Sequence, residues 1–439
     1  MEKKQNKKYV TLFVPHSLEH LTKNIKTELG FKDKTKKYLK NLYLLDIISN
    51  LLSKKNKKDK NRKNKNDNVK REGFRLSSEI LRKKYGTYYN FYIDYLINNE
   101  ILLLIEKERK GIRSRKYKIN PEIDPFFYRQ FRVYDEFFIK KKEKINKTIT
   151  ELSKNISIIE DDIKKIIEEN LYSIEINGNE ARKYIEILLE KGILEHEQYI
   201  SAFLSIEAIE NNNQRCSFDK FGRVHTNYTN LKKEIRRNFI TIDGLEICEL
   251  DIKNCQPTML ITLLQENLDK IHGEGKNVFK IDKNEFKRYV EHCKNGLYKV
   301  FVENSTLRTN LRSGEDINNL IGGTKDIVFR VLFGKNKRRN SHDKVFRLFF
   351  PTIYKFICFY KKDNHKIMAH ELQRRESNLL FGKIIREIIT KYPGIKFYTI
   401  HDSIAFQKYH KKEVEKIFNK HVEKIFTDAI NETNKVEYA

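Results

Sequence analysis

Residues 395–406 of the chain read IKFYTIHDSIAF. An apolar, β-branched run ends at His401-Asp402, and a second apolar run follows at once. This pattern predicts two antiparallel strands joined by a short turn. An acidic residue at the end of such a strand is usually a turn or helix cap, and Asp402 alone indicates no more than that.

Residues 247–260, ICELDIKNCQPTML, have a second acid, Asp251, at the end of an apolar strand, followed by an apolar helix from Thr258 to Leu264. Divalent cations such as Mg²⁺ take oxygen ligands, often one or two carboxylates plus substrate phosphates. Asp251 and Asp402 together therefore predict a site for two Mg²⁺ ions, which can activate a hydroxyl and stabilise a leaving oxygen.

Residues 322–334, GGTKDIVFRVLFG, carry a cation and two rings at four-residue spacing. Lys325, Phe329 and Phe333 therefore share one face of a predicted helix. A cation beside a metal site binds phosphates, and a ring on the same face can stack on a base. The simpler alternative is an amphipathic helix whose Lys points into solvent.

The chain has 439 residues and a formal net charge of +28, from 88 Lys and Arg against 60 Asp and Glu. The excess favours a polyanionic partner, and nucleic acid is the usual one. The alternative source is a Lys-, Asn- and Ile-rich composition of the kind that AT-rich genomes encode. Residues 54–71, KKNKKDKNRKNKNDNVKR, form a basic loop, either a solvated insertion or a segment that follows a phosphate backbone.

Several classes of protein are disfavoured by what the sequence lacks. No run of about 18 apolar residues occurs, so we expect no membrane-spanning helix and no membrane partner. The basic N-terminus has no apolar stretch behind it, which argues against a secretion signal. The five cysteines are scattered without a C-x-x-C pair. This spacing argues against a disulfide scaffold or a zinc ribbon and favours a cytoplasmic protein.

Residues 1–123 are predicted to form a winged helix-turn-helix-like domain. A helix at 38–52, a short helix at 77–85, a third helix at 88–99 and a basic hairpin at 101–119 follow in that order. Such modules place a helix in a DNA groove, although they also serve as protein-docking domains.

Residues 124–210 are predicted to form a helical region, as an arm, a thumb-like clamp or a plain connector, and residues 124–197 are predicted to be helical throughout. Residues 211–439 combine strands, Gly turns and isolated acids, and this region is predicted to carry the chemistry.

The three motifs together resemble those of the family A, DNA polymerase I-like superfamily of single-subunit polymerases, which includes phage-type RNA polymerases. Motif A is matched by residues 235–240, IRRNFI, and by the strand that ends at Asp251. Motif B is matched in register by the Lys325 helix and Gly334, and motif C by His401-Asp402-Ser403. The likeness covers about residues 215–410, and the N-terminal half shows no resemblance to the family's exonuclease domain.

The resemblance implies a right-hand polymerase of the α+β class, with an antiparallel palm sheet and helical fingers. It implies that Asp251 and Asp402 hold the metals and that Lys325 binds the incoming triphosphate. It implies nucleotide-side or primer-end roles for Phe329, Phe333, Gln256, Arg330 and His401. It implies contacts with the template–primer for Arg223, His225, Arg236 and Gln373.

This sequence departs from the family at several positions. Ile321 stands where motif B has an Arg, and Arg312 or Arg330 is a possible substitute. Phe333 lacks the hydroxyl of the usual Tyr, and Gln256 is bulky beside the sugar; both favour deoxynucleotides. Ser403 points the other way, since RNA polymerases carry His-Asp-Ser.

The function expected from these residues is template-dependent DNA synthesis on a primer, with Mg²⁺ and nucleoside triphosphates and without proofreading. Two alternatives remain open. One is a single-subunit RNA polymerase or primase, and the other is a non-catalytic DNA-binding replication factor.

Overall fold

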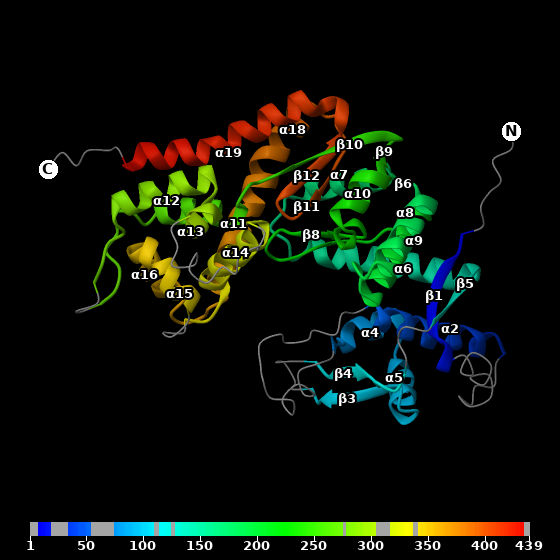
Figure 1. The fold of residues 1–439 in the computed structure, drawn as a ribbon. Helices are drawn as coiled ribbons and strands as arrows, with labels where there is room; N and C mark the ends of the chain where they lie inside the picture. The colour runs from blue at the N-terminus through cyan, green and yellow to red at the C-terminus, as the bar shows by residue number, and fades with distance from the viewer. Residues whose placement is uncertain are drawn as a thin grey trace. The chain divides into compact units, whose positions relative to one another are not determined.

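The computed structural model describes residues 8–18, 34–53, 74–108, 114–123, 128–274, 278–303, 317–336 and 341–433. The protein combines helices with antiparallel strand pairs, so the predicted α+β class is confirmed (Figure 1). The basic loop at 54–71, the turn at Lys110-Gly111 and Arg312 lie outside the described residues.

The chain forms two compact units. Unit 1 comprises Met1–Ser153, Ile174–Ser217 and His225–Gly244, and unit 2 comprises Lys154–Ser173, Phe218–Val224 and Leu245–Ala439. These units divide the chain differently from the predicted boundaries at 123 and 210.

The strands of unit 1 are β1 (Val10–Pro15), β2 (Phe74–Arg75), β3 (Leu102–Glu106), β4 (Lys116–Ile119), β5 (Tyr128–Val133), β6 (Ile174–Ile176) and β9 (Ile240–Ile242). Its helices are α2 (Lys34–Leu52), α4 (Ser78–Tyr85), α5 (Tyr89–Asn98), α6 (Glu136–Lys154), α8 (Gly178–Glu190), α9 (His196–Glu210) and α10 (Lys233–Phe239), with short 3-10 turns at His16–Leu18 and Tyr228–Asn230. The short strands β7 (Cys216–Phe218) and β8 (Val224–Thr226) lie where the chain passes between the units.

The local signals of the N-terminal segment fold as the sequence predicts. The Ser77 side chain caps α4 by accepting a hydrogen bond from the Ile80 amide, and α4 ends at Gly86, whose φ of +81° favours glycine. Strand β4 pairs with β3, and the sheet order is β2-β4-β3. The helices predicted at 77–85 and 88–99 and the strands predicted within 101–119 are therefore confirmed.

The N-terminal strand is bound to a later part of the chain. Strand β1 pairs antiparallel with β5, from Val10 opposite Val133 to Pro15 opposite Tyr128. The Thr11 amide donates to Glu207 on α9 over 2.6 Å. The prediction that residues 124–197 are helical throughout was therefore wrong at β5 and β6. Their partners, β1 and β9, are distant in sequence, so local pattern could not reveal the pairing.

The strands of unit 2 are β10 (Leu245–Asp251), β11 (Phe397–Ile400) and β12 (Ser403–Gln407). Its helices are α7 (Asp161–Leu171), α11 (Cys255–Gln265), α12 (Lys283–Asn295), α13 (Leu297–Glu303), α14 (Ile317–Phe333), α15 (Ser341–Phe349), α16 (Pro351–Tyr360), α17 (Ile367–Ser377), α18 (Arg386–Lys391) and α19 (Lys411–Thr433), with a 3-10 turn at Lys408–His410. A π-helical segment, η5 (Asn378–Ile385), joins α17 to α18.

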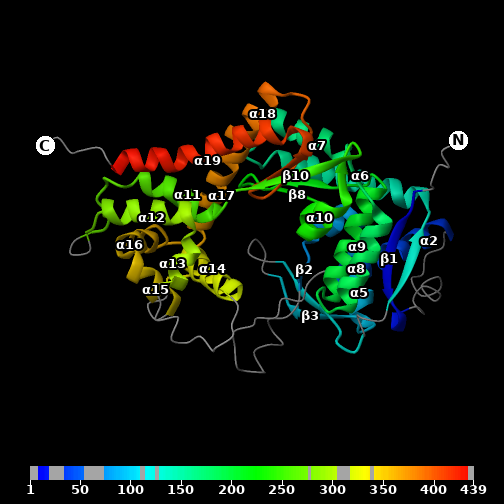
Figure 2. The same cartoon turned by 45° about the horizontal axis from the view of Figure 1, so that its top comes forward.

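Strand β12 is the middle strand of the β11-β12-β10 group, and β11 and β12 are buried along their whole length. On α7, the Asn170 side chain donates to the Phe397 carbonyl over 3.1 Å and so ties that helix to β11. Figures 1 and 2 both show α19 running beside α11 and α12, with which it packs. The hairpin predicted at 395–406 is thus confirmed, and its two strands are buried.

Two buried charged side chains fix the helices around α14. The Lys361 ammonium donates to the Val331 carbonyl and, over 2.9 Å, to the Gly334 carbonyl, and so caps the C-terminus of α14. Burial lowers the pKa of Lys361. Glu285 accepts from the amides of Thr352 and Ile353 at the start of α16. In the described ranges, every helix is too short or too polar to cross a membrane.

Candidate active site

The fold brings the two predicted acids together. Asp251 is the last residue of β10 and lies opposite Ser403 in the antiparallel register with β12. Asp402 lies in the turn between β11 and β12, and the Ile252 amide donates to its carbonyl over 3.3 Å. His401 takes a left-handed φ of +54°, which tightens this turn. Two residues 151 positions apart in the sequence are therefore neighbours in the backbone.

The carboxylates of this pair suit a hard cation. Asp251 is exposed and Asp402 is half-buried, and no side chain in the described ranges forms a hydrogen bond or ion pair with the Asp402 carboxylate. No three His, Cys, Asp or Glu side chains in the same ranges are arranged to hold a metal. A divalent ion here would therefore take oxygens from the two aspartates, with water or substrate oxygens filling the other positions.

A third carboxylate, Glu376 on α17, lies close by and is almost fully buried, with 2% of its surface exposed. The Arg223 guanidinium donates to it twice, from Nε and Nη2, each over 3.2 Å. The Gln256 side-chain amide and the Cys255 thiol, both in the first turn of α11, also donate to it. This Glu376 cluster, made of Glu376, Arg223, Gln256 and Cys255, links α17 to the start of α11.

Electrostatics places the cluster beside the aspartates. Burial raises the pKa of the Cys255 thiol well above its usual value, and the carboxylates of Glu376, Asp402 and Asp251 raise it further. Burial also raises the pKa of the Glu376 carboxyl, while Arg223 opposes that shift. The charges of three acidic groups therefore act on one thiol, and Arg223 offsets part of the charge of Glu376.

The backbone before Arg223 is held by a close approach. Gly222 has a φ of +83°, and the Ser377 hydroxyl donates to its carbonyl over 3.2 Å. A Cβ at Gly222 would collide with the Ser377 side chain. Ser377 directly follows Glu376 and precedes the π-helical segment η5, and such segments often occur at functional sites.

The predicted cation and rings lie on one face of α14. The Lys325 ammonium sits 5.3 Å from the centre of the Phe329 ring, and Phe329 stacks on Phe333 with centroids 5.5 Å apart. Lys325 and Arg330 are exposed, and both rings are half-buried. Within the described residues, no hydrogen bond or ion pair links Lys325 to an acid, so its ammonium is open to an anionic ligand.

A basic aromatic patch that the sequence analysis missed adjoins Arg223. Phe221 stacks on His370 of α17 with ring centroids 4.1 Å apart. Lys220 lies 5.1 Å and Arg374 lies 5.9 Å from the centre of the Phe221 ring. Burial and the neighbouring cations lower the pKa of His370. This Phe221 patch, made of Lys220, Phe221, His370 and Arg374, combines rings and positive charge, which is how single-stranded nucleic acid is bound.

The remaining predicted contacts fall in varied surroundings. His401 is exposed in the β11–β12 turn, and Gln373 is half-buried on α17, one turn before Glu376. His225 on β8 and Arg236 on α10 belong to unit 1. Arg236 is buried and donates to the Leu231 carbonyl over 2.6 Å, an arrangement that favours a structural role over a nucleic-acid contact.

Arg223 and Gln256 also differ in setting from what the sequence suggested. Both side chains donate to the buried Glu376. Glu376 itself was missed because it lies in a polar helix and its partner Arg223 is 153 residues away. Lys361 was missed because a Lys at the end of a helix normally points into solvent.

No known protein-family model matches the chain, and no curated protein is significantly similar to it in sequence. What the site can do is therefore inferred from its own side chains. The adjacent aspartates can hold a divalent ion. Separately, the exposed Lys325 with its two rings can bind a polyphosphate, and the Phe221 patch can bind a nucleic-acid strand.

Proposed function

We propose that this chain is a template-dependent DNA polymerase that transfers deoxynucleotides to the 3′-hydroxyl of a primer, without a proofreading exonuclease. The observation that carries the proposal is the pairing of β10 with β12, which makes Asp251 and Asp402 neighbours across 151 residues of sequence. If Asp402 only stabilised its own turn, no second aspartate would be needed at the end of the neighbouring strand β10.

Two Mg²⁺ ions held by Asp251 and Asp402 would activate the primer hydroxyl and stabilise the leaving oxygen of the diphosphate. The two aspartates supply the negative charge and the oxygen ligands that such ions prefer. Glu376 lies within electrostatic range but is already bound by Arg223 and Gln256, so its part is to position those neighbours.

The α14 face would bind the incoming nucleotide. The exposed Lys325 ammonium would pair with the triphosphate oxygens, for which it has no competing acid in the described residues. Phe329 and Phe333 offer ring faces on which a base can stack, at about 1–3 kcal/mol per base. The Lys361 cap holds the end of the helix and so keeps these rings in register.

Preference for the deoxy sugar would come from Gln256. Its amide is bound to Glu376, so the side chain is held in place and cannot swing aside for a ribose hydroxyl. Ser403, the residue that favours ribonucleotides by resemblance, is buried and its hydroxyl donates to the Ile400 carbonyl over 3.1 Å. That contact explains Ser403 as part of the turn and weakens the case for ribonucleotides.

The template–primer would be bound by the Phe221 patch and by the positive charge of the chain. The Phe221 ring and its three basic or ring neighbours offer stacking and charge on one surface. In unit 1, the order α4, α5, β3, β4 is the order of a winged helix, and we propose that this part docks on duplex DNA.

Primer extension tests the proposal. A labelled primer on a DNA template, supplied with Mg²⁺ and four dNTPs, should be extended by the wild type and by the control Asp363→Asn, since Asp363 is an exposed acid of unit 2 outside the site. Asp251→Asn and Asp402→Asn should each lower the rate of extension by about a thousandfold or more, because each removes a negatively charged ligand of the metal ions. Extension by both site variants at the control rate would refute the assignment.

The same assay with four rNTPs separates the alternatives. We expect weak incorporation of ribonucleotides and a gain on Gln256→Gly, which removes the bulk beside the sugar. Preference for rNTPs in the wild type would favour an RNA polymerase or primase. Salt-sensitive DNA binding without incorporation of any nucleotide would favour a non-catalytic binder.

A further inference from the structure

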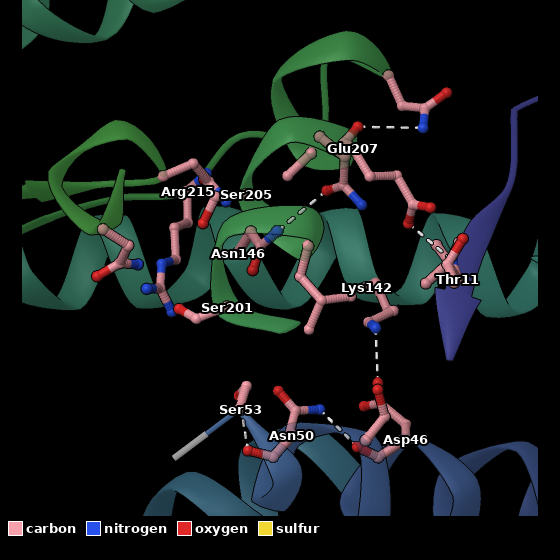
Figure 3. Close-up of a pocket in the computed structure, with 18 of the residues that line it drawn as sticks. Thr11, Asp46, Asn50, Ser53, Lys142, Asn146, Ser201, Ser205, Glu207 and Arg215 are labelled. Atoms are coloured by element: carbon pink, nitrogen blue, oxygen red, sulfur yellow. Dashed lines mark hydrogen bonds and ion pairs between the residues drawn. The ribbon is translucent and has the colours of Figure 1, made fainter. Parts of the chain in front are cut away.

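Unit 1 contains a polar pocket that the proposed polymerase site does not use. Its volume is about 170 Å³, and all the residues that line it belong to unit 1 (Figure 3). An apolar cavity of about 150 Å³ holds one benzene molecule, so this pocket has room for a small ligand. Its walls are rich in amides, hydroxyls and charged groups rather than in apolar side chains.

Two charged side chains of the lining form an ion pair, whereas the Glu207 oxygen Oε2 is buried without a hydrogen-bond partner in the described ranges. The Lys142 ammonium lies 2.6 Å from Asp46, which also accepts from the Tyr85 hydroxyl over 2.9 Å. Glu207 accepts from the Thr11 amide over 2.6 Å. Figure 3 shows the Lys142–Asp46 and Thr11–Glu207 contacts as dashed lines. In the described ranges, no acid or carbonyl binds the Arg215 guanidinium.

Arg215 is an exposed side chain at the wall of the pocket. Desolvation by the surrounding protein lowers the pKa of its guanidinium, while its side chain remains open to the pocket. The charged groups of the lining, Asp46, Lys84, Lys142, Glu207 and Arg215, leave an excess of one positive charge. A guanidinium at the wall of a pocket, with no counter-ion among the described residues, favours an anionic ligand, preferably one with two oxygens in a plane.

Further donors lie beside it. The Arg215 backbone amide donates to Asn227 Oδ1 over 2.7 Å, which fixes that side chain and leaves its Nδ2 as a donor. Asn227 is 8% exposed, and its Nδ2 has no acceptor among the described residues. Ser201 and Ser205 are four residues apart on α9, so their hydroxyls share one face of the helix and both line the pocket.

We propose that this pocket binds a small phosphate-bearing anion, with Arg215 gripping the phosphoryl oxygens and Asn227, Ser201 and Ser205 completing a set of donors. The site is separate from the two aspartates and does not depend on the polymerase proposal. Its ligand class is set by charge and geometry, because a carboxylate or phosphate oxyanion satisfies a guanidinium and an amide at once.

Calorimetric titration with inorganic phosphate and with AMP tests the proposal. EDTA is included so that no metal-held phosphate binds at Asp251 and Asp402, and ionic strength is held constant with NaCl. The wild type should bind at least one of the two anions saturably with one site per chain. Arg215→Gln should weaken that binding about tenfold or more, because a charge-assisted hydrogen-bonded contact is lost.

Arg82→Gln is the matched control, because Arg82 is an exposed arginine of α4 that does not line the pocket. It should bind as the wild type does, and Arg215→Lys should fall between the wild type and Arg215→Gln. Circular dichroism of each variant checks that it folds. Tighter binding of AMP than of phosphate would identify a nucleotide as the ligand, and equal binding would identify the phosphate group alone. Absence of saturable binding, or an equal loss in Arg82→Gln, would overturn the proposal.

Discussion

The Arg223–Glu376 pair offers a test whose magnitude follows from burial. Glu376 is 3% exposed at its side chain and Arg223 is 24% exposed. Removing one partner of a buried ion pair costs about 3–5 kcal/mol, because the other charge is left unpaired. Since water reaches the Arg223 side, we expect Arg223→Met to lower the free energy of unfolding of unit 2 by about 3 kcal/mol at pH 8.

The cost should depend on pH. Burial raises the pKa of the Glu376 carboxyl, and loss of Arg223 would raise it further. Stability tied to a raised carboxyl pKa is complete below the unfolded value of about 4.3 and is lost as pH rises through the folded value. A larger fraction of the variant's Glu376 carboxyl is protonated at pH 5 than at pH 8, so the loss of free energy of unfolding should be smaller at pH 5.

Thiol labelling reports this unfolding locally. Cys293 on α12 is 1% exposed, and burial raises the pKa of its thiol, so it reacts only when unit 2 opens. The urea midpoint for labelling of Cys293, read by mass spectrometry at pH 8 and pH 5, gives the two losses. Arg347→Met, at an exposed arginine of α15, is the control and should leave the midpoint unchanged. An unchanged midpoint for Arg223→Met at pH 8, or a larger loss at pH 5, would refute the reasoning.

Gly222→Ala should lower the melting temperature, since its Cβ meets Ser377 and φ is +83°; an unchanged calorimetric melt would contradict this. Lys361→Met should speed hydrogen exchange at the end of α14 by freeing two carbonyls, each worth about 1–3 kcal/mol when buried; exchange at the wild-type rate would count against the cap. Hydrogen bonds from Lys391 and other cations lower the pKa of Glu387 to about 2. The contribution of Glu387 to stability is therefore present above about pH 4.3 and lost as pH falls toward 2. The melting temperature of Glu387→Gln should therefore decrease less between about pH 4.3 and pH 2 than that of the wild type. Phe221→Ala should weaken binding of single-stranded DNA at fixed salt, by about 1–3 kcal/mol in a fluorescence titration.

The sequence predicted the features that depend only on residues close together in the chain. The hairpin at 395–406 and the caps of α4 need only alternation, a turn residue and a serine, so the sequence contains them directly. The helix face of Lys325 and its two rings likewise follows from four-residue spacing.

Long-range pairing decided the rest. Strand β5 is a strand because β1 lies beside it, and the Glu376 cluster exists because Arg223 comes from 153 residues earlier. Arg236 was predicted to contact nucleic acid because the stretch 235–240 resembles motif A, yet its neighbours bury it. The grouping of residues 1–153 with 174–217 in unit 1 also depends on such pairing, which no local window contains.

Mn²⁺ binding measured by electron paramagnetic resonance tests most directly whether Asp251 and Asp402 act as one metal site. With primed DNA and a non-hydrolysable dNTP present, the wild type and Asp363→Asn should each bind two Mn²⁺ ions per chain, as two-metal transfer requires. Asp251→Asn and Asp402→Asn should each lose at least one of them. Equal Mn²⁺ binding by all four proteins would contradict the claim that these two aspartates share the metals.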